Sequence, residues 1–83
     1  MELIHVIEIV NNVLAQIKSF KIKDEKDMIG MQETNKKAEE FFKALIKENY
    51  PEETDEDIES DIENGYYSYT AEGYHVYITH NWV

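Results

Sequence analysis

The residues best placed to do chemistry in this sequence form one acidic run in its second half. Eight carboxylates occupy twelve positions: Glu52, Glu53, Asp55, Glu56, Asp57, Glu59, Asp61 and Glu63. Residues 1–47 hold eight acids and eight lysines, whereas residues 48–83 hold ten acids and no lysine. The whole net charge of −10 therefore lies in the last 36 residues. Such a field repels nucleic acid and anionic lipid and attracts basic surfaces, so we expect a basic protein partner and no nucleic-acid or membrane binding.

A helix over this run would place like charges one turn apart. Asp55 with Glu59, Asp57 with Asp61, and Glu59 with Glu63 would each cost roughly 0.2–0.5 kcal/mol. Acids in the first turn suit the helix dipole, so a plain solvated helix is one interpretation. The other interpretation is a binding surface, because carboxylates about 5–6 Å apart approach the spacing of phosphates along a nucleic-acid strand. Such an acidic ridge would fit a groove built for nucleic acid.

A metal site in the acidic run is not expected. An EF-hand loop needs glycine at its sixth position and glutamate at its twelfth. Counted from Asp55, these positions hold Ser60 and Tyr66. We therefore predict neither a metal nor another cofactor.

Catalytic groups are also poorly represented. The chain has no cysteine, and Ser19, Ser60 and Ser68 lie outside any glycine-flanked elbow typical of a nucleophile. His75 and His80 would point to opposite sides of one strand. We therefore expect no enzyme, and a small enzyme is the least favoured alternative.

Tyrosines gather near the C-terminus. Five of the six lie in the segment 66–77, where tyrosine suits strands and half-buried faces. Tyrosine is also enriched among the energetically important residues of interfaces. At least two of these tyrosines should face outward, and we predict that Tyr67, Tyr69 and Tyr77 join the acidic run in contacting a partner.

The N-terminal segment is predicted to be a helix. Its apolar residues recur at spacings of three and four, namely Leu3, Val6, Val10, Val13, Ile17 and Phe20. The many β-branched residues leave a strand at residues 3–10 as an open alternative. A helix here would carry more apolar residues than one face can bury, and the excess could seal a homodimer.

The remaining elements have clearer boundaries. A second helix is predicted to end before Pro51. Thr34 or Asn35 could cap its start, and an earlier start near Asp27 is an open alternative because the apolar spacing extends backwards. A third helix is predicted over residues 55–64 with Thr54 as its cap. Residues 66–70 and 74–80 predict a hairpin with a short loop containing Gly73. The predicted fold is a single α+β domain, residues 1–83, with three helices packed with a C-terminal antiparallel β-hairpin.

These features predict a small acidic inhibitor that binds a protein. In size, charge and lack of cysteine the chain is similar to small acidic inhibitors of nucleases, restriction systems and CRISPR effectors, although no motif links it to a named family. The expected partner is a basic nucleic-acid-handling protein, and the expected source a phage or other mobile element. A cytoplasmic location is expected, because no signal peptide or span of about 20 apolar residues is found. The alternative is a self-associating assembly protein with a homodimer interface on the first helix.

Overall fold

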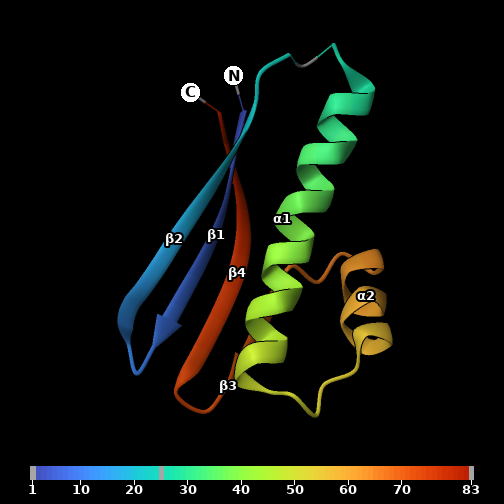
Figure 1. Ribbon diagram of the computed structural model, residues 1–83. Helices are drawn as coiled ribbons and strands as arrows, with labels where there is room; N and C mark the ends of the chain where they lie inside the picture. Colours follow the sequence, from blue (N-terminus) through green and yellow to red (C-terminus); the bar gives the residue numbers. More distant parts are fainter. Residues whose placement is uncertain (1, 25, 83) are drawn as a thin grey trace.

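A computed structural model describes residues 2–24 and 26–82, with only the backbone of Trp82. The elements are β1 (Glu2–Val10), β2 (Val13–Ile22), α1 (Met28–Asn49), α2 (Asp55–Glu63), β3 (Ser68–Ala71) and β4 (Tyr74–Trp82). The strands form one antiparallel sheet in the order β2-β1-β4-β3, and both helices lie on the same side of it (Figure 1). The predicted set of three helices with a hairpin is therefore wrong, although the protein is still α+β.

The first segment is a hairpin instead of a helix, because Asn11 and Asn12 form its turn. Their φ angles are 51° and 65°, as a two-residue turn between right-handedly twisted strands requires, and asparagine adopts this conformation more readily than most residues. The flanking β-branched residues suit strands. The helix on which a homodimer interface was predicted is therefore replaced by two strands.

Helix α1 covers the sheet, and it begins at the earlier of the two predicted starts, near Asp27. The Asp27 carboxylate accepts a hydrogen bond from the Gly30 N–H at 3.0 Å and caps the helix, and the helix ends just before Pro51 because proline disfavours the α conformation in the preceding residue. Its apolar stripe packs on β1, β2 and β4. The buried core consists of Ile4, Val6, Ile22, Ala38, Phe42, Leu45, Ile46, Ile58, Tyr74 and Val76.

Helix α2 is short and also matches its predicted position. The Thr54 hydroxyl oxygen accepts a hydrogen bond from the Asp57 N–H at 3.2 Å, which satisfies one of the free donors at the helix start. Ile58 is buried in the core and Ile62 packs against it. Gly65, at φ 84°, ends the segment. The predicted C-terminal hairpin also forms, but β4 pairs with β1 as well as with β3.

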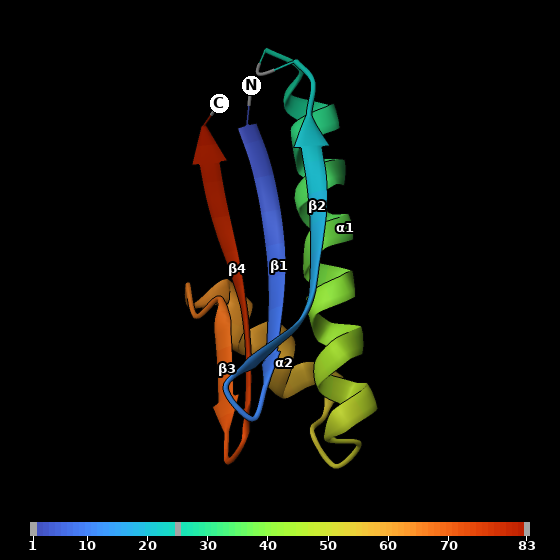
Figure 2. The same ribbon diagram turned by 90° about the vertical axis from the view of Figure 1, so that its left-hand side faces the viewer.

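The opposite face of the sheet carries no helix within residues 2–24 and 26–82 (Figure 2). Side chains alternate along a strand, so in β1 Ile4, Val6 and Glu8 face the helices, while Ile7 and Ile9 face outward. The strand register identifies fourteen outward side chains, hereafter the open face: Leu3, His5, Ile7, Ile9, Leu14, Ile17, Ser19, Lys21, Ser68, Thr70, His75, Tyr77, Thr79 and Asn81.

Candidate functional site

The acidic run lies on α2 and on the turn that precedes it. Its eight carboxylates form what we hereafter name the acidic flank: Glu52, Glu53, Asp55, Glu56, Asp57, Glu59, Asp61 and Glu63. Seven of them are exposed and Glu53 is half-buried. The cap on Thr54 and the burial of Ile58 hold the helix that presents them. The structure therefore brings the predicted acids together on α2 and the turn before it.

Two carboxylates of the acidic flank are paired with lysines of α1. Lys47 Nζ lies 2.9 Å from Asp55 Oδ1, and Lys43 Nζ lies 2.8 Å from Glu59 Oε1. The hydrogen bond and charge of Lys47 lower the pKa of Asp55, and the hydrogen bond to Glu59 raises the pKa of Lys43. These pairs relieve part of the like-charge repulsion within α2. Among the described residues, the other six carboxylates form no ion pair with a lysine.

A shallow groove of about 370 Å³ separates the two helices. It is lined by Lys36, Glu39, Glu40, Lys43, Glu59, Ile62 and Glu63. Four glutamates against two lysines leave the groove acidic, and Ile62 contributes an apolar wall. A cationic side chain of a partner would therefore meet carboxylate acceptors and an apolar contact in the same place.

The three tyrosines predicted to contact a partner are not brought together. Tyr67 is partly exposed between α2 and β3, whereas Tyr77 lies on the open face. Tyr69 points inward, where its ring packs against Tyr50 and its hydroxyl donates to Glu53 Oε1 at 3.2 Å. Burial and this hydrogen bond raise the pKa of Tyr69. Tyr69 thus contacts the acidic flank from the interior side, through its hydrogen bond to Glu53.

Tyr66 is a residue that the site prediction missed. Its side chain is 64% exposed, and it lines a small hollow with Glu53 and Asp61 of the acidic flank. Its position just after the predicted end of α2 could have indicated that Tyr66 lies near the acidic flank. Tyr66 is therefore an exposed aromatic side chain beside the acidic flank, whereas Tyr77 lies on the open face.

A polar pocket of about 200 Å³ lies between α1 and the sheet. Asn35, Glu39, Tyr67 and His80 contribute its polar groups, and His80 Nδ1 lies 3.4 Å from Glu2 Oε1. Burial raises the pKa of Glu39, and the nearby His80 opposes that shift. Proton donors and acceptors are present, but no serine, threonine or lysine nucleophile lines this pocket. Within the described residues, no cluster of three or more histidine and carboxylate side chains is placed to hold a metal ion.

Glu8 is a buried carboxylate that holds α1 on the sheet. It accepts hydrogen bonds from the Tyr74 hydroxyl at 2.6 Å, from Gln16 Nε2 at 3.0 Å and from Asn49 Nδ2 at 3.4 Å. Burial, then the hydrogen bond to Glu8, raise the pKa of Tyr74 far above its usual value. Since Glu8 lines none of the pockets described above, this cluster is structural.

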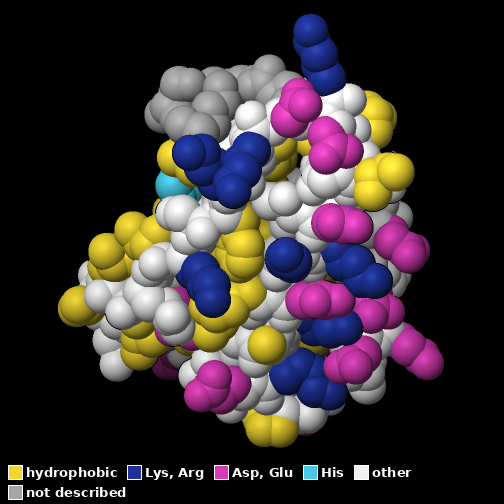
Figure 3. All heavy atoms as spheres, turned by 45° about the horizontal axis from the view of Figure 1, so that its top comes forward, with side chains coloured by type: hydrophobic (Ala, Val, Ile, Leu, Met, Phe, Trp, Pro, Cys, Tyr) yellow, Lys and Arg dark blue, Asp and Glu magenta, His cyan; other side chains and the backbone are white. Residues whose placement is uncertain are grey.

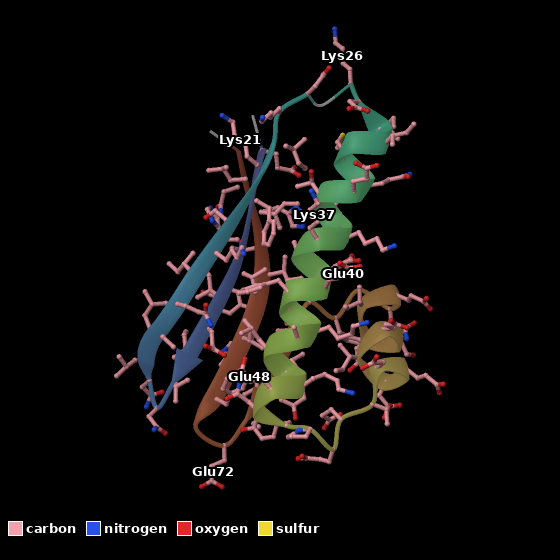
Figure 4. The ribbon with its side chains drawn as sticks, viewed as in Figure 1. Lys21, Lys26, Lys37, Glu40, Glu48 and Glu72 are labelled. Atoms are coloured by element: carbon pink, nitrogen blue, oxygen red, sulfur yellow. The ribbon has the colours of Figure 1, made fainter. Side chains whose placement is uncertain are left out.

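The open face differs from the helical side of the described residues in its charge. None of its fourteen described side chains is a carboxylate. Its lysine, Lys21, lies at one end of the sheet, and Glu72 of the β3–β4 turn lies at the other end (Figure 4). Leu14 and Ile17 of β2 are 55% and 52% exposed. In Figure 3 hydrophobic side chains gather on the strand side at left, whereas lysines and carboxylates interleave over the helices at right.

No helix within residues 2–24 and 26–82 combines the length and apolar character needed to cross a membrane.

No protein-family model matches this chain, and neither a curated protein nor a solved structure matches it. Function is therefore inferred from the chemistry of its surfaces.

Proposed function

We propose that this protein binds the basic surface of a nucleic-acid-handling protein, such as a nuclease or CRISPR effector, through the acidic flank and so inhibits it. The observation that carries the proposal is the surplus of carboxylates beside a helix rich in lysine. Lysines of α1 pair with Asp55 and Glu59, while the six other acids have no lysine partner among the described residues. The acidic flank thus has more carboxylates than the neighbouring lysines of α1 neutralise.

The geometry of α2 supports mimicry of a phosphate strand. Side chains one turn apart on a helix lie about 5–6 Å from each other, and Asp57 and Asp61 have this relation on α2. The helix is capped and fixed in the core, so little ordering of its backbone is needed on binding. Negative potential would accelerate the encounter with a basic partner.

Aromatic side chains would supply the apolar part of the contact. Tyr66 and Tyr67 follow α2 after Asn64 and Gly65, and both residues are exposed, at 64% and 41%. Tyrosine buries large area with little loss of conformational freedom, which complements carboxylates that contribute more to rate and specificity than to affinity. We place this activity in the cytoplasm, where a protein without cysteine needs no oxidising environment.

Displacement of labelled duplex DNA from nucleases and RNA-guided effectors, followed by fluorescence anisotropy, tests the proposal. The flank variant carries Glu56→Gln, Asp57→Asn and Asp61→Asn. A matched control carries Glu33→Gln, Glu48→Gln and Glu72→Gln, which are exposed acids outside the flank. Each variant removes three negative charges.

The wild type and the control should displace DNA from a susceptible enzyme, and the flank variant should need at least about tenfold more protein, or about 1.4 kcal/mol. An equal loss in both variants would show that total charge, and not the acidic flank, governs binding. Lack of displacement from every enzyme tested would also count against the proposal.

A further inference from the structure

The open face has its apolar side chains toward the β1–β2 turn and polar ones toward the chain ends. Across the strands, one row holds Ile17, Ile7, Tyr77 and Ser68, and the row next to the turn holds Leu14, Ile9, His75 and Thr70. The rows toward the chain ends are more polar and contain Ser19, His5, Thr79, Lys21 and Asn81. The apolar side chains are thus bordered by polar ones toward the chain ends and toward β3, and protein interfaces likewise combine an apolar area with a polar border.

We propose that a second copy of this chain covers the open face, so that two sheets pack face to face in a two-fold dimer. This inference goes beyond the proposed function and does not depend on it. A two-fold interface uses the same patch on both copies, so the patch must not repel itself. Acids make up 18 of the 83 residues, yet the open face has none among its fourteen side chains. Two copies with a net charge of −10 can meet here without opposing carboxylates.

The size of the face is adequate for such a contact. Strands β1 and β4 each have nine residues, which at about 3.3 Å per residue gives a length of about 30 Å. Four strands about 4.8 Å apart give a width of about 15–20 Å. Because β3 has only four residues, the flat projection is roughly 500 Å², and side-chain relief makes the accessible area larger than this projection; a standard interface buries ~800 Å² per partner.

The dimer would leave the helical side free. Both helices lie on the side of the sheet away from the open face (Figures 1 and 2). Packed sheets lie about 10 Å apart, so the layers would run helix, sheet, sheet, helix. The two acidic flanks would then face outward on opposite sides, where each remains accessible to a partner.

Sedimentation equilibrium of the wild type and two matched variants tests the proposal. Ile17→Glu places a carboxylate on the open face, and Ile29→Glu places one at the start of α1, where Ile29 is 70% exposed. Both replace an exposed isoleucine and add the same charge. We expect the wild type and Ile29→Glu to dimerise alike, and Ile17→Glu to weaken the dimer at least about tenfold. Equal behaviour of the two variants, or a wild type that stays monomeric up to about 1 mM, overturns the proposal and leaves the face to a different partner.

A measurement on the wild type alone keeps the proposal testable if Ile17→Glu does not fold. Nuclear magnetic resonance spectra recorded over a dilution series should show concentration-dependent shifts at Ile7, Ile17 and Tyr77. Ile29 and Tyr66 on the helical side should show none. Shifts confined to the helical side would place self-association elsewhere and overturn the assignment.

Discussion

Strand β1 carries apolar side chains on both faces of the sheet, but only one face is covered by the protein's own helices. In β1 the inward residues Ile4 and Val6 are fully buried, whereas the outward residues Ile7 and Ile9 are half-buried. A strand that is apolar on both sides is typical of a sheet covered on both sides. The comparison indicates that β1 has the composition of a strand in a three-layer or four-layer arrangement, while the described chain provides two layers.

The inward face should be the more sensitive to truncation. Ile4→Ala should lower the free energy of unfolding by about 2–5 kcal/mol, because it leaves a cavity under α1. Ile7→Ala should lower it by about 1 kcal/mol or less at concentrations where the protein is monomeric. Urea unfolding followed by circular dichroism measures both. Equal losses would show that the open face is already packed within the monomer.

A tyrosine pair on β4 sharpens the same comparison. Tyr74→Phe removes the 2.6 Å hydrogen bond to the buried Glu8 carboxylate, and it should destabilise the protein by about 1.5–3 kcal/mol. Tyr77→Phe on the open face should change stability by about 0.5 kcal/mol or less. Thermal unfolding of the two variants under identical conditions makes the test, and a large effect at Tyr77 would contradict it.

Salt should act in opposite directions on the two binding surfaces. Raising ionic strength from about 0.1 M to about 1 M shortens the screening length from about 10 Å to about 3 Å. Repulsion between two copies of charge −10 then weakens, so the dimer should tighten severalfold. A complex of the acidic flank with a basic partner should instead weaken. Sedimentation equilibrium and anisotropy at both salt concentrations distinguish the two, and a dimer that dissociates in salt would point to a charge-driven interface.

The smallest expected effect concerns Glu39 in the pocket beneath α1. Because burial raises its pKa above 4.5 in the folded protein, the folded state binds the proton more tightly than the unfolded state does. Stability from this group is therefore present below pH 4.5 and is lost as the pH rises through the folded pKa. Glu39→Gln should raise the free energy of unfolding slightly at pH 7 and not at pH 4.

The exposed Glu33 on the same helix provides the control for Glu39. Glu33→Gln removes the same charge from α1 without changing a half-buried side chain. If both variants gained the same stability at pH 7, the gain would come from total charge and the role assigned to burial of Glu39 would be wrong.

Sequence reasoning located the elements after residue 27 because each has local boundaries. Asp27 and Thr54 cap the two helices, Pro51 and Gly65 follow their ends, and Gly73 forms the last turn. These signals depend only on neighbouring residues and backbone conformation. The acidic flank was predictable for the same reason, since α2 is a continuous segment.

The first hairpin was mispredicted because its periodicity was ambiguous. Apolar residues on both sides of β1 hide the alternation that identifies a strand, and the remaining spacing happens to fit a helix. The Asn11-Asn12 turn was the overlooked signal. The lysine partners of Asp55 and Glu59 and the inward direction of Tyr69 depend on tertiary contacts, which no local pattern contains.

The middle of the sheet joins the two ends of the chain, since β1 pairs with β4 in a register from Glu2–Trp82 to Val10–Tyr74. At translation rates of about 5–20 residues per second, several seconds would pass between synthesis of β1 and that of β4. During that interval the nascent β1–β2 hairpin would expose apolar side chains on both faces. Its neighbour in the sheet, β4, and the complete helical layer would not yet be in place. The ribosome-bound chain is therefore the form of this protein most exposed to aggregation and most in need of a chaperone.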